Sequence, residues 1–599
     1  MTNARSSLKT VELVAAVILA VSASSSAQAQ TAAGSSAQDQ TAAASSAQEQ
    51  TAAATAPFPA HPVPPFPSGP MVPAASALDG SPVSEQNLVN GHLPPTTPDG
   101  VGPSVDAPYR APAKVSAATL TKTAGAAAAT SFTATDWPTF GMNRQRTGNN
   151  PVETVLGVGN VGGLHQKWAT NLKGPIWTQP TLATGVNVKG VLTDVVYVAT
   201  LGGKTVPAST VALNAATGAI IWQDDLSPIL SSPFCTDFNG SQGYVGFIGT
   251  PTIDRAHNKL YIVSGRGTLH AYDLATGANT TALTVQIPDP ANDPPHTYTY
   301  GSPTLTGTSL YIATASSCDT STPYHGQVVR VSITNGAILQ RWYPTGANGP
   351  SGGGIWGPGG VSVPPNEAWV YALTGNALAN PENAAFAEHV VKLTTTLAVS
   401  DSSAPSNNSA GDLDFGATAT LFQPPGCPPM LAAFQKSGAL YIYNRNSIGA
   451  GPMQTMQIGQ GTADGENVGM PAYDPKANQL YVVAPKDSPT NFSKAGLLVL
   501  PISGSCSVSW KWSSHPNGAS FGPSIPPVVA NGVVYYTDGA GGHVYAVDPA
   551  SPGSLPLWSF SSTQGIQGGI FASPMVVNGQ LYIAEGGGGT STWIRAFGL

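Results

Sequence analysis

Short apolar runs rich in β-branched and aromatic residues recur along the chain beyond residue 136. Eight of them can be recognised, at residues 195–200, 260–265, 310–315, 369–374, 430–435, 480–485, 533–538 and 581–586. Their starts lie about 48 to 65 residues apart, which leaves room for four short strands and their turns in each repeat. The pattern therefore predicts an all-β fold, an eight-bladed β-propeller of four-stranded blades.

A second run, opened by small residues or proline, precedes each of these eight. These runs occupy residues 178–183, 249–254, 301–306, 357–363, 416–422, 469–474, 525–530 and 572–577. We expect them to be the innermost strands, because strands that converge on a central channel have no space for bulk. The last repeat ends at residue 599 without an outer strand, whereas residues 164–172 have the composition of a strand. We therefore expect the N-terminal strand to complete the last blade and close the ring.

The N-terminal part of the chain divides into two segments that do not belong to the repeats. Arg5 and Lys9, an apolar stretch at 14–21 and small residues up to Ala29 predict a signal peptide over residues 1–29. Residues 30–133 are rich in Ala, Ser and Gln and then in Pro, a composition that predicts a disordered leader. The propeller is expected over 136–599, in a secreted or periplasmic protein.

The overall composition narrows the functional classes. The chain has 67 Gly, 54 Pro and only 9% charged residues, which suits an all-β protein with many turns. Its formal net charge is -7 and it has no long basic run, so we expect no nucleic-acid partner. No stretch after the signal peptide has the roughly 18 apolar residues that span a bilayer, so no membrane span is expected.

Four cysteines bear on redox state and cofactors. An even number in an exported protein favours disulfides, and we predict the pairs Cys235–Cys318 and Cys427–Cys506, each between loops of nearby blades, although spacing alone does not define connectivity. No CxxCH motif is present, so covalent haem is not expected. The ten histidines form neither an HxH nor an HExxH zinc pattern.

Several segments resemble the pyrroloquinoline quinone (PQQ) repeats of quinoprotein propellers. The turn ALNAATGAIIW at 212–222 resembles the A-x-D-x-x-x-G-x-x-x-W signature, whose tryptophan docks one blade on the next. Residues 271–277 and 546–558 are looser copies. The segment DWPTFGMNRQRTG at 136–148 is similar to the opening segment of such proteins. The resemblance covers 136–599 and implies the propeller fold.

Within this region, four segments resemble PQQ-dependent alcohol dehydrogenases in the same order along the chain. GGGIWGPGG at 352–360 implies that Trp356 lies beneath the quinone, and ALTGN at 372–376 implies that Asn376 coordinates calcium. GDLDFGA at 411–417 implies Asp414 as the catalytic base, and FQKSGALYIYNR at 434–445 implies that Lys436 contacts the quinone carbonyls. A planar anion needs an aromatic face, a cation and a metal held by oxygen ligands, and these residue types supply all three.

Some features depart from the family. At the position of the family's calcium-binding glutamate this chain has only Asp319, whose side chain is one methylene shorter and which lies in a longer loop. The pair of adjacent cysteines that covers the quinone in several of these dehydrogenases is missing. Two hypotheses therefore stay open. The first is a PQQ- and calcium-dependent dehydrogenase for a small alcohol or sugar, which needs a separate electron acceptor because no haem domain is present. The second is a noncatalytic propeller scaffold that binds a protein or polysaccharide partner.

Overall fold

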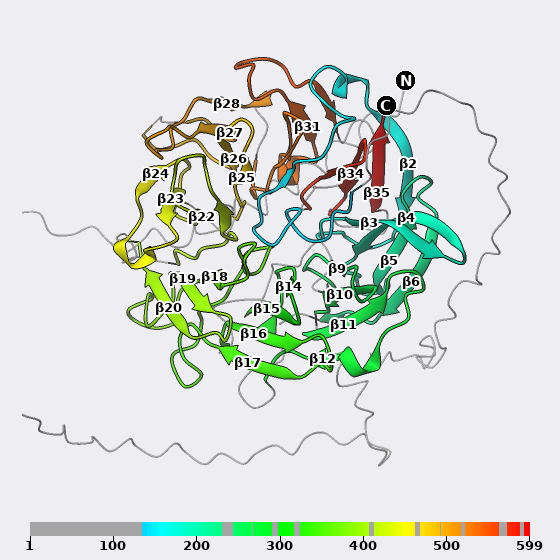
Figure 1. Ribbon diagram of the computed structural model, residues 1–599, viewed down its shortest axis with the longest axis horizontal. Coiled ribbons are helices and arrows are strands. Elements are labelled where there is room, and N and C mark those ends of the chain that lie inside the picture. The colour runs from blue at the N-terminus through cyan, green and yellow to red at the C-terminus, as the bar shows by residue number, and fades with distance from the viewer. Residues whose placement is uncertain are drawn as a thin grey trace, which may run out of the picture. The chain divides into compact units, whose positions relative to one another are not determined.

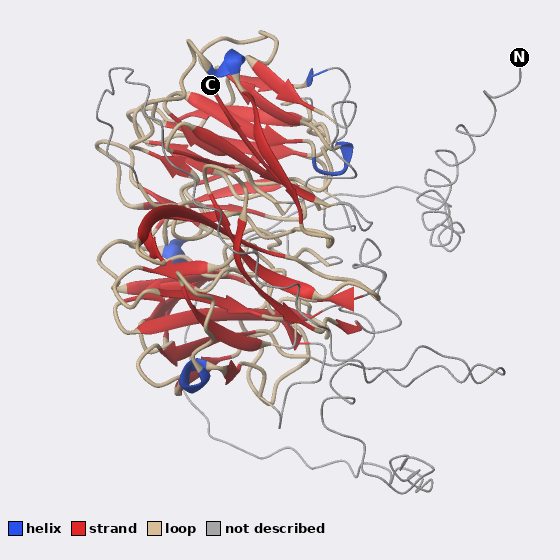
Figure 2. Cartoon of the chain, turned by 90° about the vertical axis from the view of Figure 1, so that its right-hand side faces the viewer, coloured by secondary structure: helices blue, strands red, loops and turns tan. Residues whose placement is uncertain are grey.

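In the computed structural model, the described residues form a ring of eight antiparallel sheets around a central axis (Figures 1 and 2). The structure describes residues 135–599, except 231–243, 266, 290–296, 317–323, 406–411, 462–467, 491–492, 517–520, 562–571 and 587–591. The predicted all-β, eight-bladed propeller is thereby confirmed. The predicted signal peptide and leader lie outside the described residues.

The blades follow one another in chain order, each with its first strand innermost. Blades 1 and 2 consist of β3 (Thr181–Val188), β4 (Val191–Ala199), β5 (Ala208–Asn214) and β6 (Ile220–Leu226), then β9 (Thr252–Asp254), β10 (Lys259–Val263), β11 (Thr268–Asp273) and β12 (Val285–Gln286). A short hairpin of β7 (Ile229–Leu230) and β8 (Tyr244–Val245) lies between them. Blade 3 consists of β14 (Thr304–Thr306), β15 (Ser309–Ser316), β16 (Gln327–Ser332) and β17 (Ile338–Trp342), with β13 (Thr297–Tyr298) also paired to β15.

Blade 4 departs from the four-strand pattern. It has β18 (Trp369–Leu373), β19 (Val390–Thr394) and β20 (Val399–Ser403), and its inner position is occupied by a single bridge between Ser362 and Tyr371. The predicted inner strand at 357–363 is therefore reduced to one bridge. Glycines and a proline dominate this segment, and they have low strand propensity.

The remaining blades complete the ring. Blades 5 and 6 consist of β21 (Thr420–Phe422), β22 (Met430–Phe434), β23 (Ala439–Asn444) and β24 (Gln454–Gln457), then β25 (Ala472–Asp474), β26 (Gln479–Ala484), β27 (Gly496–Pro501) and β28 (Trp512–Ser514). Blade 7 consists of β29 (Val528–Ala530), β30 (Val533–Thr537), β31 (Val544–Val547) and β32 (Trp558–Phe560). Blade 8 consists of β33 (Met575–Val577), β34 (Gln580–Ala584) and β35 (Trp593–Gly598), and β2 (His165–Asn171) pairs with β35 as its outermost strand.

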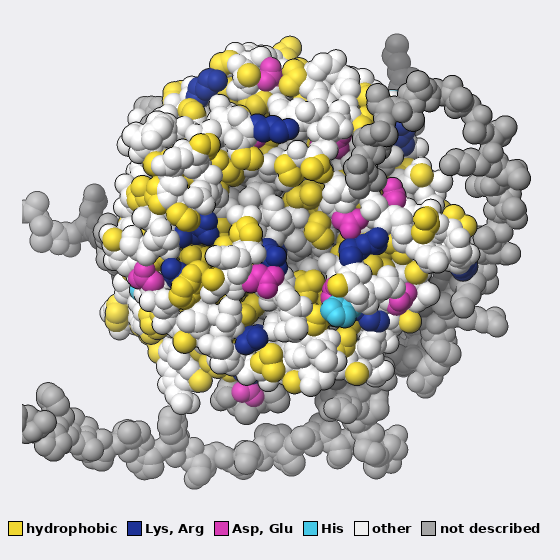
Figure 3. All heavy atoms as spheres, viewed as in Figure 1, with side chains coloured by type: hydrophobic (Ala, Val, Ile, Leu, Met, Phe, Trp, Pro, Cys, Tyr) yellow, Lys and Arg dark blue, Asp and Glu magenta, His cyan; other side chains and the backbone are white. Residues whose placement is uncertain are grey.

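Helical structure in the described part is limited to single 3₁₀ turns. These are η1 (Val161–Gly163), η3 (Thr281–Leu283), η4 (Ile448–Ala450) and η6 (Gly539–Gly541). Among the described residues, no helix is long and apolar enough to cross a membrane. Lys and Arg side chains are scattered over the face shown in Figure 3 and form no basic patch there.

Tryptophans on five of the eight outermost strands pack these blades against the next one, at positions 168, 222, 342, 512 and 558. Trp168 Nε1 donates to the Ala215 carbonyl (2.9 Å), and Trp222 Nε1 donates to the Leu274 carbonyl (2.9 Å). The turn at Thr276 and Gly277 leaves space for the Trp222 indole of the preceding blade. A β-carbon at Gly277, where φ is 71°, would lie 2.6 Å from the Trp222 ring. Only glycine tolerates both the left-handed backbone and this close contact.

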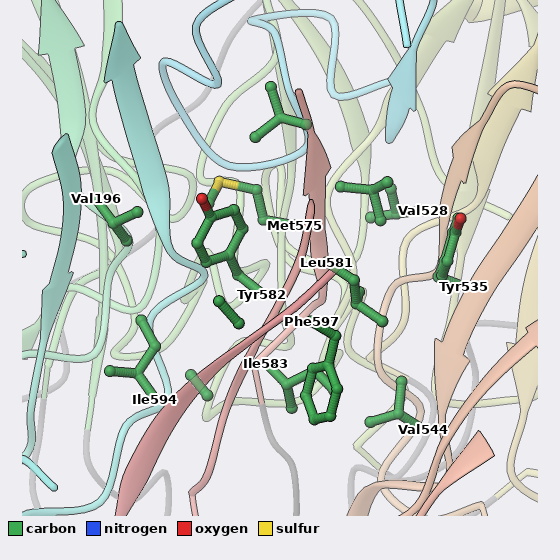
Figure 4. Close-up of a cluster of buried hydrophobic side chains, with 14 of the residues drawn as sticks. Val196, Val528, Tyr535, Val544, Met575, Leu581, Tyr582, Ile583, Ile594 and Phe597 are labelled. Atoms are coloured by element: carbon green, nitrogen blue, oxygen red, sulfur yellow. The ribbon is translucent and has the colours of Figure 1, made fainter. Parts of the chain in front are cut away.

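Apolar side chains fill the space between neighbouring blades. The cluster in Figure 4 joins blades 7, 8 and 1 and contains Val196, Tyr535, Leu581 and Phe597, all at most 1% exposed. Successive side chains of a strand point to opposite faces of the blade. Each face that packs against a neighbouring blade therefore contributes to one such cluster. Aliphatic and aromatic burial on this scale is the main stabilising contribution to the ring.

Residues 135–153, which we call the hub segment, run along the innermost strands of all eight blades. Main-chain hydrogen bonds connect Trp137 to Leu182, Pro138 to Ile253, Arg144 to Val363, Gln145 to Leu421, Thr147 to Tyr473 and Gly148 to Val529, over blades 1, 2, 4, 5, 6 and 7. β1 (Asn149–Asn150) pairs in parallel with β29, and Asn150 Nδ2 donates to the Val576 carbonyl of blade 8 (2.9 Å).

Arg146 joins the hub segment to blade 3 from the interior of the ring. The side chain is fully buried, and its guanidinium donates to Thr139 Oγ1 (2.8 Å), the Phe140 carbonyl (2.9 Å) and Thr304 Oγ1 (2.6 Å). These acceptors are all neutral. Desolvation consequently lowers the pKa of Arg146 to about 9.

Candidate functional site

Four of the five residues predicted from the sequence lie in loops of blades 4 and 5. Trp356 precedes the inner bridge of blade 4, and Asn376 follows β18. Asp414 precedes β21, and Lys436 lies in the turn between β22 and β23. Antiparallel strands alternate in direction, so the loops that lead into first strands and the loops between second and third strands share one face of the ring.

Asp414 lies at the centre of this group. Its side chain is 2% exposed, and its Oδ1 accepts a hydrogen bond from the Asn376 backbone N–H (2.7 Å). Its Oδ2 accepts one from Lys436 Nζ (2.7 Å). A buried carboxylate needs such compensation, because an unpaired charge out of water is costly. The loops of blades 4 and 5 are thereby joined through one side chain.

Lys436 also forms an ion pair with Asp412, a residue that the sequence analysis did not select. Its Nζ lies 2.8 Å from Asp412 Oδ1, and the side chains of Lys436 and Asp412 are 11% and 40% exposed. Burial lowers the pKa of Lys436, but the Asp414 and Asp412 carboxylates outweigh this effect and raise it. Desolvation and the negative charge of Asp414 raise the pKa of Asp412, against the opposing effect of Lys436.

Two further residues hold the peptide between these aspartates. Glu388 Oε1 accepts a hydrogen bond from the Leu413 N–H (3.1 Å), and Gln435 Nε2 donates to the Leu413 carbonyl (2.8 Å). The Tyr441 hydroxyl donates to Gln435 Oε1 (3.0 Å). Burial raises the pKa of Glu388 to about 7. The positions of Asp412 and Asp414 are therefore set by a buried network in blades 4 and 5.

Trp356 approaches Asp414 across a glycine. A β-carbon at Gly375 would lie 2.6 Å from Trp356 Nε1 and 2.2 Å from Asp414 Oδ1, so only glycine permits this approach. The indole also packs near Tyr300, with ring centroids 5.3 Å apart. Its Nε1 is buried and has no hydrogen-bond partner among the described residues.

The four residues fit a planar, polar cofactor better than they fit a metal ion alone. Asn376 Oδ1, like Trp356 Nε1, is buried without a hydrogen-bond partner in the described part, so both have bonding capacity for an additional group. Lys436 supplies a cation. Calcium takes six to eight oxygen ligands, whereas the described residues contain no cluster of three His, Cys, Asp or Glu able to hold a metal. Asp319, the remaining predicted ligand, lies outside the described residues.

The sequence carried only weak signals for the additional residues of the site. Asp412 and Gln435 each lie inside a segment that was singled out for another residue, but no local pattern distinguishes Glu388 from a surface acid. Of the two predicted disulfides, Cys427–Cys506 is confirmed. The pair Cys235–Cys318 lies outside the described residues.

The chain is similar to known propellers at low sequence identity. A PQQ-repeat family model, described as "Outer membrane protein assembly factor BamB", matches residues 165–336. A europium-containing methanol dehydrogenase structure is 14% identical, with a TM-score of 0.59, and the match covers 78% of this chain and 98% of that one. A quinohemoprotein alcohol dehydrogenase from Comamonas testosteroni is 16% identical, with a TM-score of 0.56, and the match covers 77% and 80%.

The comparison with curated protein sequences found no match. The structural likenesses, at these identities, extend to the fold. Together with the family model they support a propeller built from PQQ-type repeats that resembles the quinoprotein dehydrogenases.

Proposed function

We propose that this propeller of PQQ-type repeats, which resembles the quinoprotein dehydrogenases, is an exported enzyme that binds PQQ and oxidises a small alcohol or a sugar. The observation that carries the proposal is the position of Asp414, which is hydrogen-bonded to Asn376 and Lys436 and lies across Gly375 from the Trp356 indole. A base, a cation, an aromatic ring and an unpartnered amide oxygen are thus within one small region.

PQQ, when bound, would accept the hydride from the substrate carbon. Trp356 would provide the aromatic face, and Lys436 would provide positive charge near the cofactor's oxygens. Asn376 Oδ1, together with Asp319, would contribute oxygen ligands if calcium binds. Each of these assignments rests on the resemblance and on the residue chemistry.

Asp414 would take the proton of the substrate hydroxyl. Lys436 lies between two carboxylates, 2.7 Å from Asp414 Oδ2 and 2.8 Å from Asp412 Oδ1. When Asp414 becomes protonated, Asp412 still neutralises Lys436, so the buried cation keeps a partner at every stage. Asp412 therefore supports the role of Asp414 as a general base.

Titration of the full-length protein with PQQ and calcium tests the proposal. We expect a saturable quinone absorbance band and reduction of an artificial electron-accepting dye upon addition of an alcohol or a sugar. Asp254→Asn is the matched control for Asp414→Asn, because Asp254 is also buried and paired with a basic side chain, His257 (2.8 Å). A folded wild-type protein that binds no PQQ would refute the proposal.

The second candidate function is a noncatalytic scaffold that binds a protein or polysaccharide. The match of residues 165–336 to the family model described as an outer membrane protein assembly factor supports it. In addition, both oxygens of Asp414 already accept hydrogen bonds, as they would in a purely structural ion pair. Failure of PQQ binding together with intact folding would favour this alternative.

A further inference from the structure

A groove of about 410 Å³ lies at the seam between blades 5 and 6. Figure 1 shows the outermost strands of these two blades, β24 and β28, at the outer edge of the ring. One wall is β24, the outermost strand of blade 5, and the other is the segment that leads into β28 of blade 6. The lining residues are Gln454, Thr455, Met456, Gln457, Thr490, Val508, Ser509 and Trp510. Neither Asp414 nor Lys436 lines this groove, which is therefore separate from the candidate site.

Trp510 differs from the tryptophans that dock the blades. The outermost-strand tryptophans are at most 9% exposed, at positions 168, 222, 342, 512 and 558. Trp510 is 38% exposed and is the only aromatic residue among the exposed large hydrophobic side chains of the described part. Docking of the blades therefore does not account for it, and an exposed indole in a groove is typical of a binding surface.

The rest of the groove is lined by five polar residues together with Met456 and Val508, and it carries no charge. None of its lining residues is Asp, Glu, Lys, Arg or His. The Thr455 and Ser509 hydroxyls form no side-chain hydrogen bond within the described part, and Gln457 uses its Nε2 but not its Oε1. These groups are free to bond a ligand that has many hydroxyls.

The groove is preformed. Gln454 Nε2 donates to the Val508 carbonyl (2.6 Å), and Gln454 Oε1 accepts a hydrogen bond from the Val508 N–H (2.8 Å), so one side chain holds both walls together. The Cys427–Cys506 disulfide joins the same two blades nearby. A preorganised site loses less entropy when it binds a ligand.

We propose that this groove binds a neutral glycan, with a sugar ring stacked on Trp510. The face of an indole is electron-rich, and the C–H face of a pyranose carries partial positive charge, so the two attract each other. Hydroxyls at the sugar's edge would bond to Thr455, Gln457 and Ser509. The absence of ionisable lining residues favours a neutral sugar over an anionic one. This site is independent of the proposed dehydrogenase activity.

Calorimetry and tryptophan fluorescence on the full-length protein test this proposal. The probes are cellohexaose, laminarihexaose and maltohexaose, with hexagalacturonate as the anionic comparison. We expect at least one neutral hexasaccharide to bind more tightly than hexagalacturonate. We expect Trp510→Ala to weaken that binding about tenfold or more, as loss of an aromatic stacking platform does. Leu555→Ala, an exposed apolar residue of blade 7's outer loop, is the control and should bind normally.

Three results would overturn the proposal. They are no binding of any neutral hexasaccharide at millimolar concentration, equal binding by folded Trp510→Ala, and preference for an extended peptide, which would assign the groove to strand addition along β24. Circular dichroism establishes that each variant is folded. Dye reduction with PQQ is measured separately and should be unchanged in Trp510→Ala, so failure of the glycan proposal is distinguishable from failure of the enzyme proposal.

Discussion

Lys436 Nζ lies 2.7 Å from Asp414 Oδ2 and joins the turn between β22 and β23 to the loop that leads into β21. This pair is almost completely buried, and Asp412 shares the same cation. The chain thus places one ammonium group between two carboxylates, and the loss of any of the three changes the charge balance of the site.

Replacement of Asp414 by Asn should separate binding from chemistry. The change removes the base but little volume, so we expect most of the PQQ affinity to remain and dye reduction to be abolished. Spectroscopic titration and a dye assay measure the two effects, with Asp254→Asn as the control. Equal loss of affinity and activity would assign Asp414 a binding role instead.

Replacement of Trp356 by Ala should weaken PQQ binding, by about 1 to 3 kcal/mol on the scale of lost aromatic stacking. Trp369→Ala is the matched control, because Trp369 belongs to the same blade but lies near Lys392, with Nζ 4.3 Å from the ring centroid. Isothermal titration calorimetry measures both variants. Unchanged affinity in a folded Trp356→Ala protein would remove Trp356 from the site.

Replacement of Lys436 by Met should destabilise the fold in a pH-dependent way. Breaking a buried ion pair costs about 3 to 5 kcal/mol when the remaining charge keeps no partner. Without the cation, the folded-state pKa of Asp412, which burial and the negative charge of Asp414 already raise, should rise further above its unfolded value. The variant should therefore be closest to wild type at low pH and lose stability as the pH rises from the unfolded pKa of Asp412 to its raised folded pKa. Urea unfolding at pH 4.5 and pH 8 provides the comparison, and an equal deficit at both pH values would contradict this assignment.

Glu388 should oppose folding once it is ionised. Its folded pKa is about 7, against an ordinary value near 4.5. Since the folded pKa is raised, the unfolded state ionises first, and stability falls as the pH rises from about 4.5 to about 7. At roughly 1.4 kcal/mol per pKa unit, the loss is on the order of 3 kcal/mol. Glu388→Gln should abolish this pH dependence and be more stable than wild type at pH 8, as urea unfolding would measure. A variant with the wild-type pH profile would show that another group titrates.

The hub segment should be required for folding, whereas the residues before it should not. A chain that starts at Thr135 should fold, because residues 135–153 bond to the inner strands of all eight blades. A chain that starts at residue 154 should not form a cooperative fold. Limited proteolysis of the full-length protein should leave a fragment that begins near Asp136, and a protected fragment that retains residues 50–110 would contradict the prediction.

The disulfide Cys427–Cys506 should stabilise the seam between blades 5 and 6. It closes a loop with a sequence separation of 79 residues, for which chain-entropy arguments give about 4 kcal/mol. The Cys427→Ala/Cys506→Ala double variant should therefore lower the free energy of unfolding by roughly that amount.

The second predicted disulfide, Cys235–Cys318, can be tested by peptide mapping of the wild-type protein without reductant. Free thiols or crossed pairs would reject it.

The sequence alone determined the repeat and its number. Apolar runs such as 480–485, each preceded by a run opened by small residues or proline such as 469–474, recur along the chain, and this signal is local. The Thr-Gly turns and the tryptophans that follow them, such as Gly218 and Trp222, are local signals in the same sense. Resemblance to a family then brought Trp356, Asn376, Asp414 and Lys436 into consideration.

Only the tertiary structure decided which groups meet. Asp412, Glu388 and Gln435 act on the site through hydrogen bonds to residues 22 to 25 positions away in other loops, and no local periodicity reports such partners. The path of the hub segment along all eight blades is likewise invisible in the sequence, because its contacts to six of the blades are main-chain hydrogen bonds that depend little on side-chain identity. Local patterns determine strands through short apolar runs that recur along the chain, whereas the site depends on long-range polar pairing, which is defined only after the blades have closed into a ring.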